Sequence, residues 1–182
     1  KSNVIPAEHQ PPLTGQLSDV EYMAVGGSYT EDDEGNLGVP QSVAVKRGIT
    51  ETDKIIGMPK QVGVPVITSP QPGQVPTDNT ISFRLNTSYR PDLFYVRVLT
   101  GMGRPLWAAT VPGSASSVRL PDFPDFSHLP ESKRPEPYPG GGYSLSIMAI
   151  DHPTLSYRNF SYSDLSIQKW KAFSANGQII QF

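Results

Sequence analysis

Four acidic residues stand side by side at positions 31–34, and a glycine and an asparagine follow them. Carboxylate and amide oxygens at close spacing suit a hard cation such as Ca²⁺. The candidate calcium ligands are therefore Asp32, Asp33, Glu34 and Asn36. When Gly35 is aligned with the turn glycine of a helix–loop–helix calcium site, Thr30 and Gln41 occupy positions that need acidic ligands. A solvated turn is therefore the favoured interpretation, calcium is the alternative, and no other cofactor is predicted.

Residue types that serve in catalysis are present, but no known catalytic motif joins them. His128 and His152 lie near acids and His9 lies in the N-terminal segment, without the spacing of a metal site. We therefore expect these histidines to be surface residues. The serines within residues 113–117 form no Gly-x-Ser-x-Gly elbow, and no glycine-rich phosphate loop occurs. The chain has no cysteine, which excludes thiol nucleophiles, disulfides and thiolate metal sites. The expected protein is not an enzyme.

Aromatic residues supply a more specific candidate for binding. Trp107 follows Leu106 in an apolar run, and strand alternation places one of the two on an outer face. A second group lies in a stretch rich in serine and asparagine, at Tyr157, Phe160 and Tyr162. Aromatic rings with amide and hydroxyl neighbours are used for sugar stacking and for protein docking. These four aromatics are the candidate binding residues, and the favoured alternative is that they cap one end of the core.

The composition predicts a fold of many short elements. Among 182 residues there are 19 prolines and 16 glycines, and 37% of the residues are hydrophobic. The formal net charge is −2 and no basic stripe is visible, so we expect no nucleic-acid partner. No apolar run reaches the roughly 18 residues that a membrane-spanning helix needs, so no transmembrane span is predicted.

The N-terminal residues 1–15 contain three prolines and little periodicity, so we expect an extended leader or linker. The sequence begins with Lys1 instead of methionine. This beginning fits removal of a signal peptide, or a lipoprotein tether with a lipid anchor upstream, and an arbitrary start point explains it equally well.

The clearest strand signal is the segment at 143–150. Its apolar residues are Tyr143, Leu145, Ile147 and Ala149, with serines at 144 and 146 between the first three. This period of two predicts a strand with one face on a core and one face toward water. A glycine run at 140–142 leads the chain into it. The segment indicates an all-β fold in which Tyr143, Leu145 and Ile147 lie between two packed sheets.

Residues 16–63 form a small β-rich region, with strands predicted at 20–25, 42–46 and 52–58. Breaks are expected at Gly26 and Gly27, and again at Arg47 and Gly48. Three strands are too few to close a sandwich, so further strands lie upstream or these strands pack on the C-terminal domain. Over residues 20–60 the pattern resembles the closing half of carboxypeptidase regulatory-like β-domains of bacterial surface proteins.

Residues 64–182 contain a proline-flanked first strand at 64–68, Phe83 in an alternating strand, a strand at 94–99, and the Tyr143 strand after a glycine turn. With these features the region resembles a fibronectin type III or related immunoglobulin-like β-sandwich. The resemblance implies that the Tyr143 hydroxyl closes a corner of the fold. Trp170 is expected in the packing, in a strand at 166–173. The Asn176-Gly177 pair predicts a hairpin turn before the last strand.

The expected function is that of a non-enzymatic structural or binding module, such as a spacer, an assembly subunit or an adhesin-like domain. Loops and strand edges on a rigid sandwich are suited to this role. We expect an extracellular or cell-envelope location in a bacterium, with a protein partner or self-assembly. The alternatives are a carbohydrate-binding module and an accessory domain of a secreted hydrolase.

Overall fold

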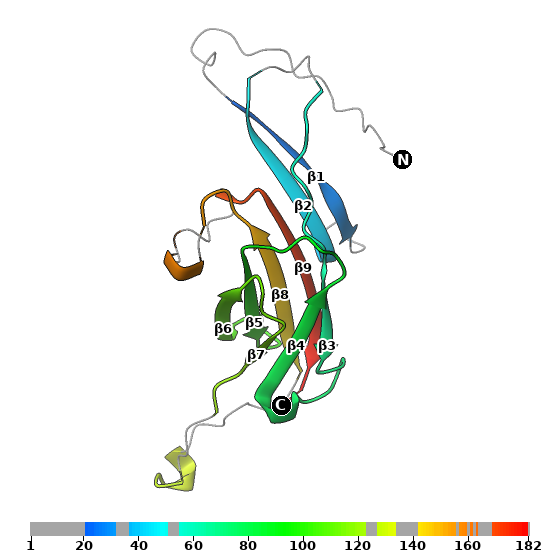
Figure 1. Cartoon of the computed structure of the whole chain (residues 1–182). Coiled ribbons are helices and arrows are strands. Elements are labelled where there is room, and N and C mark those ends of the chain that lie inside the picture. The colour runs from blue at the N-terminus through cyan, green and yellow to red at the C-terminus, as the bar shows by residue number, and fades with distance from the viewer. Residues whose placement is uncertain are drawn as a thin grey trace.

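The computed structural model consists of two antiparallel β-sheets packed as a sandwich (Figure 1). It describes residues 21–31, 37–50, 55–122, 127–133, 142–155, 157–159, 161, 163 and 169–181. Helical structure among them consists of short 3₁₀ turns, including Thr77–Asn79, Glu131–Lys133 and Tyr157–Asn159. The prediction of an all-β fold is confirmed. Within these ranges, no helix has the length and hydropathy needed to cross a membrane.

Six strands form the larger sheet, in the spatial order β1-β2-β9-β8-β5-β6. Their bounds are β1 Tyr22–Glu31, β2 Leu37–Ile49, β5 Leu93–Leu99, β6 Pro105–Pro112, β8 Tyr143–Asp151 and β9 Ala172–Ile180. The smaller sheet has the order β3-β4-β7. Its bounds are β3 Pro65–Ser69, β4 Thr80–Leu85 and β7 Ser117–Arg119. In Figure 1 the smaller sheet lies across β5, β8 and β9, while the β1–β2 hairpin extends beyond it.

The main core lies between the two sheets. Tyr143 is 2% exposed, and Leu145 and Ile147 are completely buried. Phe83 of β4 meets Phe94 of β5 across the core, edge to face, with ring centroids 4.8 Å apart. Aromatic pairs in this geometry add to the free energy gained by burying their area. The alternating sequence of β8 therefore faces the smaller sheet with its apolar side.

A second apolar cluster covers part of the outer face of the larger sheet. Its buried members are Val43, Val45, Leu93, Ile150, Trp170 and Phe173. Because successive residues of a strand point to opposite faces, Ile150 lies on the face opposite to Ile147. Trp170 packs edge to face on Phe173, with ring centroids 5.2 Å apart. Trp170 is therefore buried in packing, outside the inter-sheet core.

The β1–β2 hairpin belongs to the larger sheet, because residues 41–44 of β2 pair with residues 172–175 of β9. The predicted breaks are wrong: β1 continues through Gly26 and Gly27, and β2 continues through Arg47 and Gly48. At Gly27 a β carbon would lie 2.2 Å from the Ser42 carbonyl oxygen, so the close approach of the strands itself requires glycine. Within the predicted 52–58 strand, residues 55–58 are not in a strand and residues 51–54 lie outside the described residues.

Strand β9 runs without a turn through Asn176 and Gly177, so the predicted hairpin is wrong. Here Asn176 pairs with Ile147 and Gly177 with Ser146 of β8. Side chains of β9 also bind the chain that leads into and out of β3. Ser174 Oγ donates to the Gly63 carbonyl at 2.8 Å, Asn176 Nδ2 to Pro65 at 2.9 Å, and Gln178 Nε2 to Pro70 at 2.6 Å. These bonds hold the first strand of the smaller sheet against the larger one.

Candidate functional site

A cleft lies where the β1–β2 hairpin leaves the sandwich. Its volume is about 650 Å³, within the range of small-ligand sites. Backbone pairing assembles it, because Val45 N donates to the Lys171 carbonyl at 2.6 Å and Lys171 N to the Asp151 carbonyl at 2.9 Å. The lining residues come from β2, from residues 59–60, from Tyr89, from the end of β8 and from the chain before β9: Val45, Lys46, Arg47, Pro59, Lys60, Tyr89, Asp151, His152, Pro153, Thr154, Lys169, Trp170 and Lys171.

Two carboxyl groups and a phenol form a network beside this cleft, and Tyr89 and Asp151 of the network line it. The Tyr89 hydroxyl donates to Asp151 Oδ2, and the backbone amide of His152 donates to Asp92 Oδ2 at 2.8 Å. Asp151 also contributes a hydrogen bond and its negative charge to the surroundings of the Asp92 carboxyl group. Thr154 N donates to His152 Nδ1 at 3.2 Å. The network ties the start of β5 to the end of β8.

The environment changes the proton affinity of two of these groups. Burial raises the pKa of Asp92, and the hydrogen bond from Asp151 raises it further, although the His152 amide and the charge of Lys171 act against this. Burial raises the pKa of Tyr89 to about 12, and the hydrogen bond and negative charge of Asp151 contribute to the same shift. Both shifts favour the neutral form of the group concerned, the carboxylic acid at Asp92 and the phenol at Tyr89.

Five cationic side chains line the cleft. These are Lys46, Arg47, Lys60, Lys169 and Lys171, and among the described lining residues Asp151 is the single carboxylate. The Lys60 ammonium lies 4.9 Å from the centroid of the Tyr89 ring, and Arg47 Nη1 donates to the Trp170 carbonyl. The arrangement suits electrostatic attraction of an anion.

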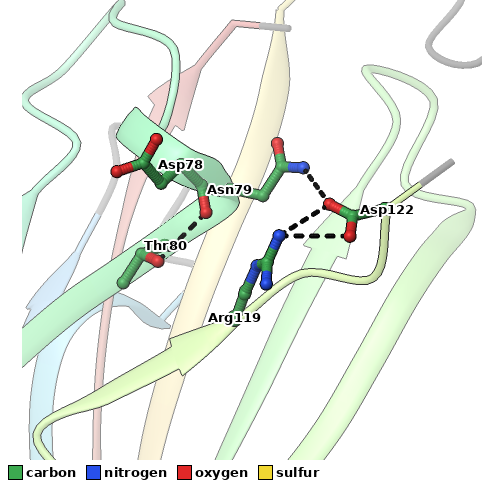
Figure 2. Close-up of polar contacts among 5 residues, drawn as sticks. All are labelled: Asp78, Asn79, Thr80, Arg119 and Asp122. Atoms are coloured by element: carbon green, nitrogen blue, oxygen red, sulfur yellow. Dashed lines mark hydrogen bonds and ion pairs between the residues drawn. The ribbon is translucent and has the colours of Figure 1, made fainter.

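A second hollow, of about 570 Å³, lies at the opposite end of the smaller sheet. There Arg119 Nη2 contacts both carboxylate oxygens of Asp122, at 2.9 Å and 3.1 Å, and Asn79 Nδ2 donates to Asp122 Oδ1 at 3.2 Å (Figure 2). Asp78 and Asn79 both have positive φ, of 50° and 54°, which these residue types tolerate best after glycine. Leu120 N donates to the Asn79 carbonyl at 2.7 Å. We interpret the group as a clasp between β4 and β7, since Arg119 already neutralises the Asp122 carboxylate.

The structure separates the aromatic residues predicted to bind. Trp107 is half-buried and packs against the main core. Tyr157 is 39% exposed, and its hydroxyl donates to the Thr110 carbonyl of β6 at 3.2 Å. Phe160 and Tyr162 lie outside the described residues, as do the candidate calcium ligands Asp32, Asp33, Glu34 and Asn36. Within the described part of the chain, no three His, Cys, Asp or Glu side chains are placed to hold a metal ion.

Sequence reasoning missed the cleft. Its cations lie at positions 46 to 171, and no local run marks them. The expectation of surface histidines is wrong for His152, which is 6% exposed, whereas His128 is exposed and His9 lies outside the described residues. The sequence signal that could have indicated the cleft is the pair of lysines at 169 and 171, which the pairing of β8 with β9 brings close to Asp151. Comparison with protein-family models, curated proteins and solved structures found no match to this chain.

Proposed function

We propose that this chain is a non-enzymatic module of the fibronectin type III or immunoglobulin-like class, with a structural or binding role. The strand order supports this assignment. The order β3-β4-β7 corresponds to strands A, B and E of such a sandwich, and β9-β8-β5-β6 corresponds to G, F, C and C′. In this correspondence the β1–β2 hairpin extends the sheet beyond strand G.

The observation that carries the proposed role is the contrast between the two edges of the larger sheet. Edge strand β6 begins and ends with proline, and Tyr157 covers its Thr110 carbonyl. Prolines and covering groups protect an edge from pairing. Edge strand β1 has ten residues and no proline, and no described strand pairs with its outer side.

Apolar side chains accompany the open main-chain groups of β1. Met23 is 59% exposed, Val25 58% and Tyr29 49%. A long edge with exposed apolar residues is a template for a further strand, because the added strand satisfies the free N–H and C=O groups and buries the side chains. The role we propose is therefore assembly by strand addition at β1, with a second copy as the partner.

We also propose an extracellular or cell-envelope location in a bacterium. The support is the resemblance of the two sequence regions to modules of surface proteins. Fractionation of the cells that naturally produce the protein, with an antibody raised against the chain, tests the location. Recovery only from the cytoplasm would count against it.

The assembly role is tested by sedimentation of the full chain over a range of concentrations, with hydrogen exchange of the β1 amides. We expect particles larger than a monomer, with β1 amides that gain protection as the concentration rises. The variant Val25→Lys/Tyr29→Lys should remain a monomer, because a charge on this face opposes stacking of strands. The control Leu106→Lys places one lysine on the β6 edge, where the leucine is 37% exposed, and should assemble like the parent. A monomeric parent with rapidly exchanging β1 amides would refute the proposal.

A further inference from the structure

The cleft concentrates positive charge in a chain that is acidic overall. The chain has 15 Lys and Arg against 17 Asp and Glu, yet the described residues that line this cavity include five cations and one carboxylate. Within the described residues, no carboxylate forms an ion pair with Lys46, Lys60 or Lys171. Like charges gathered close together repel one another, so Lys46, Lys60 and Lys171 are stabilised when an anion binds among them.

The surroundings of the cations indicate which kind of anion fits. Trp170 is buried edge to face on Phe173, and Lys60 already covers the Tyr89 ring. Neither ring therefore offers an open face on which a sugar would stack. Four of the five cations are lysines, which act as point charges and accept carboxylates in many orientations. A flexible chain that carries several carboxylates matches these properties best.

We propose that the cleft binds an acidic peptide segment, and that its occupant in the assembled protein is residues 31–34 of a second copy. This segment has the sequence Glu-Asp-Asp-Glu, four carboxylates in a row. Its charge complements that of the cleft. The inference deepens the proposed assembly role and rests on it, but it uses different residues from the β1 edge.

The acidic segment cannot occupy the cleft of its own chain. It lies between Glu31 at the end of β1 and Leu37 at the start of β2. The cleft begins at Val45, eight residues farther along β2, and at about 3.3 Å per strand residue this is about 26 Å from Leu37. A contact between the hairpin end of one copy and the cleft of the next joins two different surfaces. Repeated contacts of this kind produce a closed ring or an open filament.

Peptide binding tests the cleft directly. A labelled peptide with the sequence of residues 29–37 is titrated with the full chain, and binding is followed by fluorescence anisotropy. We expect saturable binding that weakens with salt, and Lys46→Glu/Lys60→Glu should weaken it by about tenfold or more. Lys133→Glu is the control, because it reverses an exposed cation that does not line the cleft. Circular dichroism verifies that each variant retains its β fold.

A charge exchange tests the occupant. The cleft variant Lys46→Glu/Lys60→Glu and the segment variant Asp32→Lys/Asp33→Lys should each lose salt-sensitive association, and an equimolar mixture of the two should regain it. Both variants keep the native β1 strand, so they should lose the salt-sensitive association and retain the salt-insensitive pairing through β1. This difference separates the cleft contact from the β1 contact. The proposal is overturned if the peptide does not bind, if the cleft variant binds it normally, or if the mixture fails to associate. Binding of polygalacturonate without binding of the peptide would assign the cleft to an acidic glycan, and would equally overturn it.

Discussion

The Tyr89 hydroxyl donates a hydrogen bond to Asp151 Oδ2, and this contact joins the loop after β4 to the last residue of β8. Burial raises the pKa of Tyr89 to about 12, and the hydrogen bond to Asp151 adds to the shift. Because the folded pKa is above the ordinary value of 10.0, the contribution of Tyr89 to stability is complete below pH 10.0 and is lost as the pH rises through about 12.

The first prediction is that Asp151→Asn lowers the pKa of Tyr89 toward its ordinary value. The amide removes the negative charge that opposes formation of the phenolate, while burial remains. Ultraviolet titration of the parent should contain a late-ionising phenol that Tyr89→Phe removes. Asp122→Asn, which removes a carboxylate remote from Tyr89, should leave the titration unchanged. An unaltered late phenol in Asp151→Asn would contradict the assigned hydrogen bond.

The second prediction concerns Asp92, whose pKa is raised by burial and by its hydrogen bond with Asp151. The folded protein thus holds this proton more tightly than the unfolded chain does. The contribution of Asp92 to stability is complete below the unfolded pKa and is lost as the pH rises through the folded pKa.

Asp92→Asn should therefore raise the melting temperature at neutral pH. The amide oxygen can still accept from the His152 backbone N–H, and the amide NH₂ group can donate to the Asp151 carboxylate. Melting curves from about pH 4 to about pH 7 should be flatter for the variant than for the parent. A variant that melts lower than the parent at neutral pH, with the same pH dependence, would show that the pKa of Asp92 is not raised in the folded protein.

The third prediction concerns the contact between β9 and β3. Asn176→Ala leaves the Pro65 carbonyl without its 2.9 Å side-chain donor, and we expect a loss of about 1–2 kcal/mol in the free energy of unfolding. Asn86→Ala is the matched control, since Asn86 is an exposed asparagine just after β4, and it should change stability by less than about 0.5 kcal/mol. Urea denaturation measures both. Equal losses of unfolding free energy in the two variants would show that the hydrogen bond from Asn176 to Pro65 does not stabilise the contact between β9 and β3.

The same residue explains why the last hairpin was not predictable from the sequence. Asn176-Gly177 favours a tight turn locally, but in the fold the Asn176 side chain binds Pro65 and its backbone pairs with Ile147 of β8. A local preference is outweighed when distant partners satisfy the strand conformation. The β8 strand was predictable because its alternation alone determines which face is buried.

The candidate site was unpredictable for a related reason. The pairing of β2 with β9 brings Lys46 near Lys171, and the sequence contains no signal for that pairing because the two strands are more than a hundred residues apart. The aromatic candidates, in contrast, stand out locally in the sequence: Tyr157, Phe160 and Tyr162 lie in one short stretch, and Trp107 lies in one predicted strand. Trp107 faces the core because it pairs with Val98, a buried residue of β5, and the sequence does not specify that neighbour.

The last prediction concerns Gly113, which follows β6. A β carbon at this position would lie 1.7 Å from the Pro91 carbonyl oxygen, and Gly113 N donates to the Asp92 carbonyl at 3.0 Å. Because the obstructing atom belongs to the backbone, no side-chain rotation can make room for a methyl group. Gly113→Ala should therefore lower the free energy of unfolding by about 3 kcal/mol or more.

Gly57→Ala is the control, since nothing lies within 4 Å of a β carbon there. It should change stability by less than about 0.5 kcal/mol, or raise it slightly by restricting the unfolded chain. Urea denaturation of both variants, with hydrogen exchange at the β5–β6 amides, measures the effect. We expect loss of protection in Gly113→Ala to begin where β5 and β6 pair at Leu93 and Pro112, because the displaced turn lies beside that pair. Two variants of equal stability would mean that the chain at Pro91 moves aside without cost, and that this close backbone approach does not constrain the sandwich.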